Sequence, residues 1–159
     1  MPVAALVPLA LLSTLTACGG SGKHAGPARL VAGPGYTYTV PMGWRVLHTE
    51  RSTTAAGGGS VVSVTVFLLR KPYTPSLFPS ATRELNRVAA RLAADSHGRL
   101  TESITTTLAG QKARAYRYST AAYEARIGFV LAGRREYELF CRDAKDPACD
   151  LLFASFAFG

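Results

Sequence analysis

Histidine and acidic residues are scarce in this sequence, which has three His and ten Asp or Glu against eighteen Lys or Arg. The histidines, His24, His48 and His97, stand far apart, and no H-E-x-x-H, G-x-S-x-G or P-loop motif occurs. His48 and Glu50 are neighbours on one expected strand, and a solvated surface pair explains them. We therefore expect no enzyme activity, no metal site and no cofactor. A triad assembled by the fold is the alternative that a single sequence leaves open.

The sequence also lacks, near its start, an apolar run long enough to span a bilayer. Residues 3–12 are apolar, ten residues against the roughly 20 of a transmembrane helix. Leu15-Thr16-Ala17-Cys18 follows, and then a run of Gly and Ser. This order resembles the signal peptide and lipobox of bacterial lipoproteins, [LVI]-[ASTVI]-[GAS]-C, whose cysteine sulfur attacks a lipid donor. One departure is that no Lys or Arg precedes Lys23.

The lipobox resemblance implies that residues 1–17 are a signal peptide and that Cys18 carries the lipid, with acyl chains such as palmitate. We expect the mature chain to be anchored by this lipid on the extracytoplasmic face of the cell membrane. Residues 18–35 are rich in Gly, Ala and Pro, which favours a flexible tether. Residues 36–159 are of the right length for a single domain.

Cysteine is rare too, with three residues of which lipidation would use Cys18. The other two, Cys141 and Cys149, are expected in an oxidising compartment, so we predict that they form a disulfide across a short loop. A redox or metal pair is the alternative. Their spacing is not C-x-x-C, and no histidine lies nearby in the sequence to complete a metal site, so the disulfide is favoured.

The formal net charge is +8, and every charged residue follows Cys18. A basic surface outside the cell suits anionic lipid headgroups, wall polymers or acidic proteins. Frequent Arg, Ala and Gly explain the same charge by composition alone. No Lys/Arg block with interleaved aromatic residues is present, so we expect no nucleic-acid partner. We expect the partner to be an unknown envelope protein or an anionic envelope component, with the membrane reached through the lipid anchor.

Hydrophobic periodicity predicts an α+β domain. A four-turn amphipathic helix is expected to begin at Ser80 as N-cap and to end at Gly98, and a shorter helix has Asp146 as N-cap and Pro147 at its first position. The glycine-rich residues 55–60 are interpreted as a mobile hairpin tip. Alternating patterns predict strands at 36–40, 44–49, 61–69, 100–108, 112–119, 126–132 and 136–141.

Two short motifs resemble the Mog1/PsbP-like families, including the actinobacterial LpqN-type lipoproteins. One is the opening Tyr38-Thr-Val-Pro-Met-Gly-Trp44, and the other is the closing Phe153-Ala-Ser-Phe156. The resemblance implies an antiparallel sheet flanked by helices in an α/β/α sandwich, with Trp44 as a packing residue. It also implies a non-enzymatic adaptor or binding role.

Two other functions remain as alternatives. Phe67, Leu69, Phe129 and Phe140 would line an apolar cavity in a carrier of lipid or glycolipid, although a closed core uses the same residues. An envelope hydrolase would require His48 to lie in a cleft with a nucleophile and an acid. The ligand-binding residues cannot be identified from these patterns.

Changing Cys18 to Ala is expected to release the protein from the membrane, or to leave its precursor uncleaved, because the thiol is the site of lipid attachment. The folded domain should be unaffected, since the tether separates Cys18 from the first predicted strand. Membrane fractionation and mass spectrometry of the mature protein measure both effects. A mature wild-type protein without diacylglycerol on Cys18 would contradict the lipoprotein interpretation.

Overall fold

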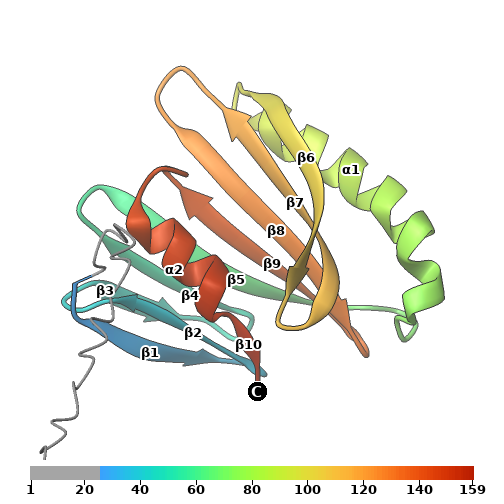
Figure 1. The fold of residues 1–159 in the computed structure, drawn as a ribbon, viewed down its shortest axis with the longest axis horizontal. Helices are drawn as coiled ribbons and strands as arrows, with labels where there is room; N and C mark the ends of the chain where they lie inside the picture. Colours follow the sequence, from blue (N-terminus) through green and yellow to red (C-terminus); the bar gives the residue numbers. More distant parts are fainter. Residues whose placement is uncertain (1–25) are drawn as a thin grey trace, which may run out of the picture.

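The computed structural model describes residues 26–159, in which ten strands and two α-helices follow one another (Figure 1). The predicted signal peptide, residues 1–17, and Cys18 lie outside the described residues. No helix in the described part has the length and apolar character needed to cross a membrane. The elements are β1 Ala28–Gly33, β2 Tyr36–Pro41, β3 Arg45–His48, β4 Ser52–Gly57, β5 Ser60–Leu68, a 3-10 turn Pro75–Leu77, α1 Phe78–Asp95, β6 Arg99–Leu108, β7 Gln111–Ser119, β8 Glu124–Ala132, β9 Arg135–Arg142, α2 Pro147–Ser155 and β10 Ala157–Phe158.

The strands form two antiparallel sheets. The larger has seven strands in the order β3-β4-β5-β9-β8-β7-β6, and the smaller has three in the order β1-β2-β10. Each neighbouring pair in the larger sheet is a hairpin except β5 and β9, which pair over eight residues although the helix α1 and three strands separate them in sequence. This mixed α+β arrangement agrees with the predicted fold class.

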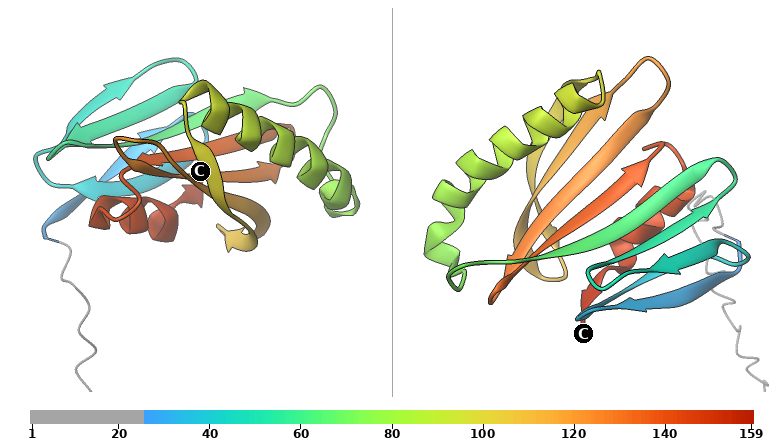
Figure 2. Two further views of the ribbon diagram at one scale, coloured as in Figure 1. Left: turned by 90° about the horizontal axis from the view of Figure 1, so that it is seen from above. Right: turned by 180° about the vertical axis from the view of Figure 1, so that it is seen from behind.

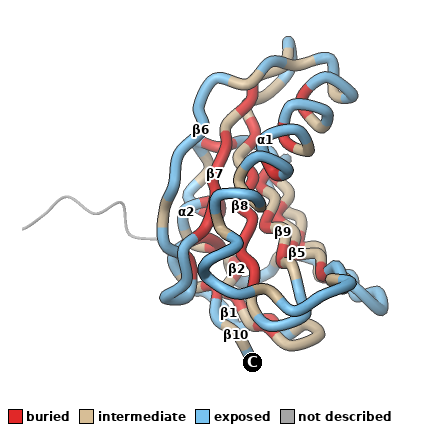
Figure 3. The backbone as a smooth tube through the Cα atoms, turned by 90° about the vertical axis from the view of Figure 1, so that its right-hand side faces the viewer, coloured by how far each residue is buried: buried red, intermediate tan, exposed pale blue. Residues whose placement is uncertain are grey.

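Alternating side chains of the large sheet enter two hydrophobic clusters on its opposite faces. On β8, Ile127 and Phe129 belong to the cluster under α1, whereas Val130 belongs to the cluster under α2 and the small sheet. On β9, Tyr137 and Leu139 belong to the second cluster. The two helices lie on different sides of the sheet when it is seen from above (Figure 2). Buried positions run along β8 on both of its faces, whereas on β5 and β9 they alternate with half-buried ones (Figure 3).

Residues 28–33, which we assigned to the tether, form strand β1, so the tether prediction is wrong for this stretch. All six residues pair with β2, and Val31 is 5% exposed. The Gly and Ala residues in 26–33 have low strand propensity, so the sequence did not predict a strand there. The strand is stabilised by its pairing with β2 and not by local propensity. Two further strands were not predicted, β4 and the two-residue β10. Of residues 55–60, which we expected to form a hairpin tip, only Gly58 and Gly59 do so, because residues 55–57 belong to β4 and Ser60 begins β5.

The ends of α1 differ from the prediction by a few residues. The helix begins at Phe78, and the Ser80 hydroxyl donates to the Leu77 carbonyl instead of capping. At the other end, His97 takes the left-handed conformation (φ 55°), and Gly98 N–H donates to Ala93 O at 2.8 Å, as in a Schellman motif. Gly98 is required by close approach, because a Cβ there would lie 2.8 Å from the Ser119 carbonyl oxygen.

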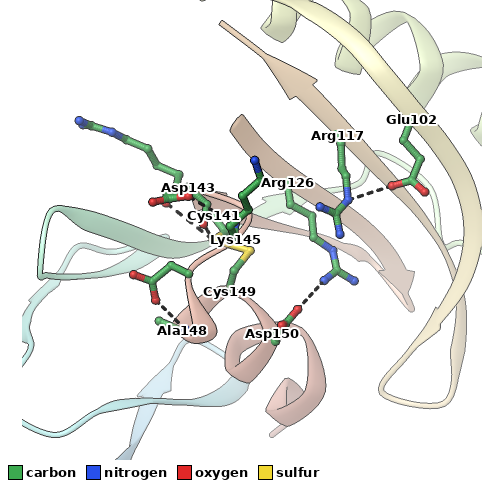
Figure 4. A network of polar contacts seen from close by, with 11 residues as sticks. Glu102, Arg117, Arg126, Cys141, Asp143, Lys145, Ala148, Cys149 and Asp150 are labelled. Atoms are coloured by element: carbon green, nitrogen blue, oxygen red, sulfur yellow. Dashed lines mark hydrogen bonds and ion pairs between the residues drawn. A yellow bond between two sulfur atoms is a disulfide. The ribbon is translucent and has the colours of Figure 1, made fainter. Parts of the chain in front are cut away.

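The start of α2 is as predicted. Asp146 is its N-cap, its carboxylate accepting the Ala148 N–H at 2.7 Å, and Pro147 opens the helix. The predicted disulfide between Cys141 and Cys149 is present, with a Cα–Cα distance of 5.5 Å, and both cysteines are completely buried. It joins the end of β9 to the first turn of α2 (Figure 4).

Replacing both Cys141 and Cys149 with Ala is expected to lower the free energy of unfolding by about 2–3 kcal/mol, because the cross-link restricts the unfolded chain. Thermal unfolding should show a decrease of several degrees in Tm. Reduction of the wild type should lower its Tm by a similar amount and leave the double variant unchanged. Equal Tm values for oxidised and reduced wild type would refute a stabilising disulfide.

Candidate functional site

The two histidines within residues 26–159 are not brought together. His48 is exposed on β3, one edge of the seven-stranded sheet, and His97 is exposed just before β6, the opposite edge. Glu50 is exposed in the turn after β3. His24 and Cys18 lie outside the described residues. Among residues 26–159, no three His, Cys, Asp or Glu side chains gather in a way that would hold a metal ion.

Trp44 packs against the cluster under α2 and is partly buried, which confirms its predicted packing role. Its ring lies over Gly57 of β4, where an added Cβ would come within 2.6 Å of the indole. A small hollow beside it is bounded by Pro41, Gly58 and Asp146. Trp44 therefore fixes the edge of the sheet onto the end of β2.

The two faces of the large sheet are covered unequally. On one face, α2 and the small sheet cover β5 and β9. On the other face, α1 packs against β6 and β7, and the view from behind shows β9, β5 and β4 without a helix over them (Figure 2). We call the uncovered side chains of β5 and β9 the open face. They are Val61, Ser63, Thr65 and Phe67 on β5 and Glu136, Glu138 and Phe140 on β9.

Glu136 and Glu138 stand at the centre of the open face among neutral side chains. Glu138 lies opposite Thr65 on one side and Phe129 on the other, and Glu136 lies between Phe67 and Leu131. Both glutamates are half-buried. Within residues 26–159 neither forms an ion pair, and none of the hydrogen bonds of the fold ends on their carboxylates.

The surroundings disfavour the charged form of both acids. Burial raises the pKa of Glu138 above its ordinary value, and burial followed by repulsion from Glu138 raises the pKa of Glu136. The pKa of Tyr118 is raised as well, first by burial, with the charge of Glu138 a lesser contribution. Titratable groups with such shifts, placed on an accessible surface, are typical of functional sites.

Nearby cations are engaged elsewhere. Arg142, on the same side of β9, stacks on the Tyr123 ring with its guanidinium carbon 5.3 Å from the ring centre. Arg114 of β7 is 8% exposed beneath α1. It donates to Thr105 Oγ1 at 2.9 Å and to Asn86 Oδ1 at 3.3 Å, and also contacts Ser103 Oγ. This network attaches α1 to β6 and β7 and so leaves the open face bare.

The opposite face of the sheet shows the contrasting arrangement, in which the charges are paired. Arg126 lies over the Phe153 ring at 3.9 Å and donates to Asp150 at 3.4 Å, while Arg117 bonds Glu102 at 2.9 Å (Figure 4). Burial, followed by the charge of Arg117, lowers the pKa of Arg126. These pairs join α2, β8, β7 and β6, so their role is explained by the fold itself.

The aromatic residues considered for a carrier do not share one enclosed space. Phe129 is completely buried under α1, and Leu69 and Phe140 pack partly buried against the same cluster. Phe67 is 41% exposed on the open face. Three of the four side chains thus contribute to a packed cluster, and the fourth adds an apolar surface beside Glu136.

Sequence reasoning placed Glu136, Glu138 and Phe140 on one side of a strand but did not identify a site there. The signal was the predicted strand 136–141, in which two acids alternate with apolar residues. The two acids are half-buried and without an ion pair in residues 26–159 because β9 is central in the sheet and α1 lies over other strands. Local sequence patterns show neither the place of β9 in the sheet nor that of α1.

No family model and no curated protein matches the sequence. Among solved structures, the fold is similar to the solution structure of cyanobacterial PsbP (CyanoP) from Synechocystis sp. PCC 6803. The TM-score is 0.60 and the sequence identity 14%, over 91% of this chain and 99% of that chain. The chain therefore has a PsbP-like fold.

The raised pKa values predict how stability depends on pH. The carboxyl groups of Glu136 and Glu138 bind a proton more tightly in the folded state than in the unfolded state. Their protonation therefore stabilises the fold below the ordinary pKa of glutamate, and this stabilisation is lost as pH rises through the raised pKa values. Glu138→Gln should therefore raise Tm at neutral pH and change it little under acidic conditions. Glu50→Gln controls for loss of one surface charge. A Glu138→Gln effect that does not vary with pH would contradict this account.

Proposed function

We propose that the protein is a lipid-anchored lipoprotein on the extracytoplasmic face of the cell membrane, and that its domain is a non-enzymatic binding or adaptor module. The lipobox at Cys18 supports the location, and the buried disulfide is of the kind found in oxidising compartments. The same proposal assigns the domain to an α/β/α sandwich of the Mog1/PsbP-like, LpqN type. Its outer layers are α1 on one side of the large sheet, and α2 with the small sheet on the other.

The observation that carries the binding role is the open face with its unpaired Glu136 and Glu138. An uncovered sheet face beside a helix offers a shallow platform, and exposed Phe67 adds apolar area at its edge. Two carboxylates without a counter-charge are unfavourable in the isolated domain, so their presence is better explained by a bound partner. Such a partner protein would present a Lys or Arg side chain beside an apolar group.

Binding of this kind would be strongest when both carboxylates are charged. A partner cation would gain charge-assisted hydrogen bonds to Glu136 or Glu138 in partly desolvated surroundings, where such bonds are stronger than at an open surface. Because the pKa values of both acids are raised in the free protein, acidification should weaken binding by protonating them. The partner would in turn lower those pKa values on binding.

A photo-crosslinking residue at Thr65, which lies opposite Glu138, tests this proposal in cells at native expression. We expect it to form defined adducts with an envelope protein, and the same residue at Ala154, exposed on α2, to form none of them. Combining the Thr65 probe with Glu136→Gln and Glu138→Gln should abolish the adducts.

Absence of adducts at Thr65, or adducts shared with Ala154 and insensitive to the glutamate changes, would refute the open face as the binding site. Fractionation of the same cells tests the membrane location independently of partner binding. Cys18→Ala should release the domain from the membrane whether or not the open face binds a partner.

A further inference from the structure

One end of the molecule gathers five cationic side chains from separate segments. Arg134 and Arg135 lie at the β8–β9 turn, Arg70 and Lys71 follow β5, and Arg51 lies in the β3–β4 turn. All five are exposed. Together with Leu68, the last residue of β5, they are here called the basic tip.

Backbone hydrogen bonds hold these segments side by side. Leu69 N–H donates to Arg134 O at 2.9 Å, Tyr73 N–H to Gly133 O at 2.7 Å, and Val66 N–H to Arg51 O at 2.8 Å. The β8–β9 turn and the loop from β5 to α1 are therefore adjacent, at the lower right of Figure 1. The cations belong to ordered, hydrogen-bonded backbone, so their positions relative to one another are defined by the fold.

The charges of the basic tip are not balanced by acids. Within residues 26–159, none of its five cations lies in an ion pair. Glu50 is the acidic neighbour of Arg51 in the same turn. Glu136, which follows Arg135 on β9, is a second neighbouring carboxylate. Five cations against these two carboxylates leave an excess of three positive charges at one end of a chain whose formal net charge is +8.

An exposed apolar side chain stands among these cations. Leu68 is 78% exposed, the most exposed large hydrophobic residue in the described part of the chain, and it lies directly opposite Arg135. A shallow hollow beside it is bounded by Pro34, Val66 and the oppositely charged Glu50 and Arg51. A soluble polyanion would need the cations but has no use for a projecting leucine.

We propose that the basic tip is a membrane-docking surface for bilayers that contain anionic phospholipids. The arginines and the lysine contact lipid phosphates, and Leu68 enters the boundary between headgroups and acyl chains. The combination of a basic ring and an apolar group is what interfacial membrane binding uses, since each part strengthens the other.

The geometry is compatible with a lipid anchor, although the docking does not depend on one. Gly35, in the β1–β2 turn, lies against Arg135 at the basic tip, and Ala28 lies at the far end of β1. Five residue steps of strand span about 17 Å. The ten residues from Cys18 to Ala28 reach up to about 35 Å when extended, so an anchored domain can place its tip on the same membrane.

Vesicle binding tests the proposal with the oxidised chain 18–159 carrying Cys18→Ser, so that no lipid is attached. This chain keeps both hydrophobic clusters and every strand and helix of the described residues, which lie within residues 28–158. We expect binding to vesicles of phosphatidylcholine with about one-third phosphatidylglycerol, and none to phosphatidylcholine alone. Arg70→Gln, Lys71→Gln and Arg134→Gln together should weaken binding by about a hundredfold, roughly fivefold per cation.

The matched control removes three exposed cations elsewhere, with Arg45→Gln, Arg91→Gln and Arg99→Gln, and should weaken binding by only about threefold, because these charges are distant from the surface in contact. Leu68→Ser should weaken binding by about tenfold or more, whereas Leu30→Ser, at a leucine that is 67% exposed on β1, should not. Equal losses in the two triple variants would overturn the docking surface in favour of net charge alone. If Leu68→Ser leaves vesicle binding unchanged, or if soluble polyphosphate binds the protein as tightly as the vesicles do, the membrane-docking proposal would be overturned in favour of binding to an anionic polymer.

Discussion

The pairing of β5 with β9 is the interaction on which the rest of the structure depends. It is antiparallel over eight residues, and it joins two hairpin arrays, β3–β5 and β6–β9, into one sheet. Without it, Val62 and Val64 of β5 would not face the same cluster as Leu139 and Cys141 of β9. Such non-local pairing is costly in chain entropy, and burial of one face of β5 and β9 against α2 and the small sheet offsets this cost. The disulfide at the end of β9 adds a covalent constraint beside this pairing.

Coverage of the two faces then determines where the molecule can interact with others. The face under α2 and the small sheet is closed, and the charges near its edge form pairs such as Arg126 with Asp150. The other face is covered only where α1 lies on β6 and β7, held there by Arg114 and Asn86. Glu136 and Glu138 lie beyond the reach of that helix. They stay half-buried because neighbouring aromatic and aliphatic side chains surround them, and within residues 26–159 neither forms an ion pair.

The two proposed surfaces differ in physical character. The open face is shallow, acidic at its centre and enclosed by neutral side chains, which suits recognition of a specific partner group. The basic tip is formed by turns, carries an excess of cations and exposes Leu68, which suits a laterally mobile anionic surface. The two surfaces adjoin, because the Phe67–Glu136 pair of the open face is next to the Leu68–Arg135 pair of the basic tip. Successive side chains of a strand point to opposite faces of the sheet, so the two pairs face different sides.

Local patterns predicted the strands that lie in the C-terminal meander, the amphipathic helix, the Asp146 cap and the Cys141–Cys149 disulfide. These features rest on short-range rules: alternation, a 3.6-residue period, capping chemistry and a close cysteine pair. Strand β1 was missed because Ala28–Gly33 has little strand propensity and depends on β2 for its hydrogen bonds. The predicted end of α1 was too late in the chain, because the left-handed residue that ends the helix is His97 and not Gly98. Gly98 is instead needed for close packing against the backbone of Ser119.

The sequence by itself therefore determined the two helices, seven of the ten described strands, the side of each of these strands on which a residue lies, and the cysteines available for cross-linking. It placed Glu136 and Glu138 on one side of a strand, and Arg70, Lys71, Arg134 and Arg135 in connecting segments. Only the tertiary structure decided that β9 is central, that its acidic side is left uncovered, and that the cations converge around Leu68. The physical reason is that burial and charge density depend on neighbours brought together by non-local pairing, which periodicity along the chain does not encode.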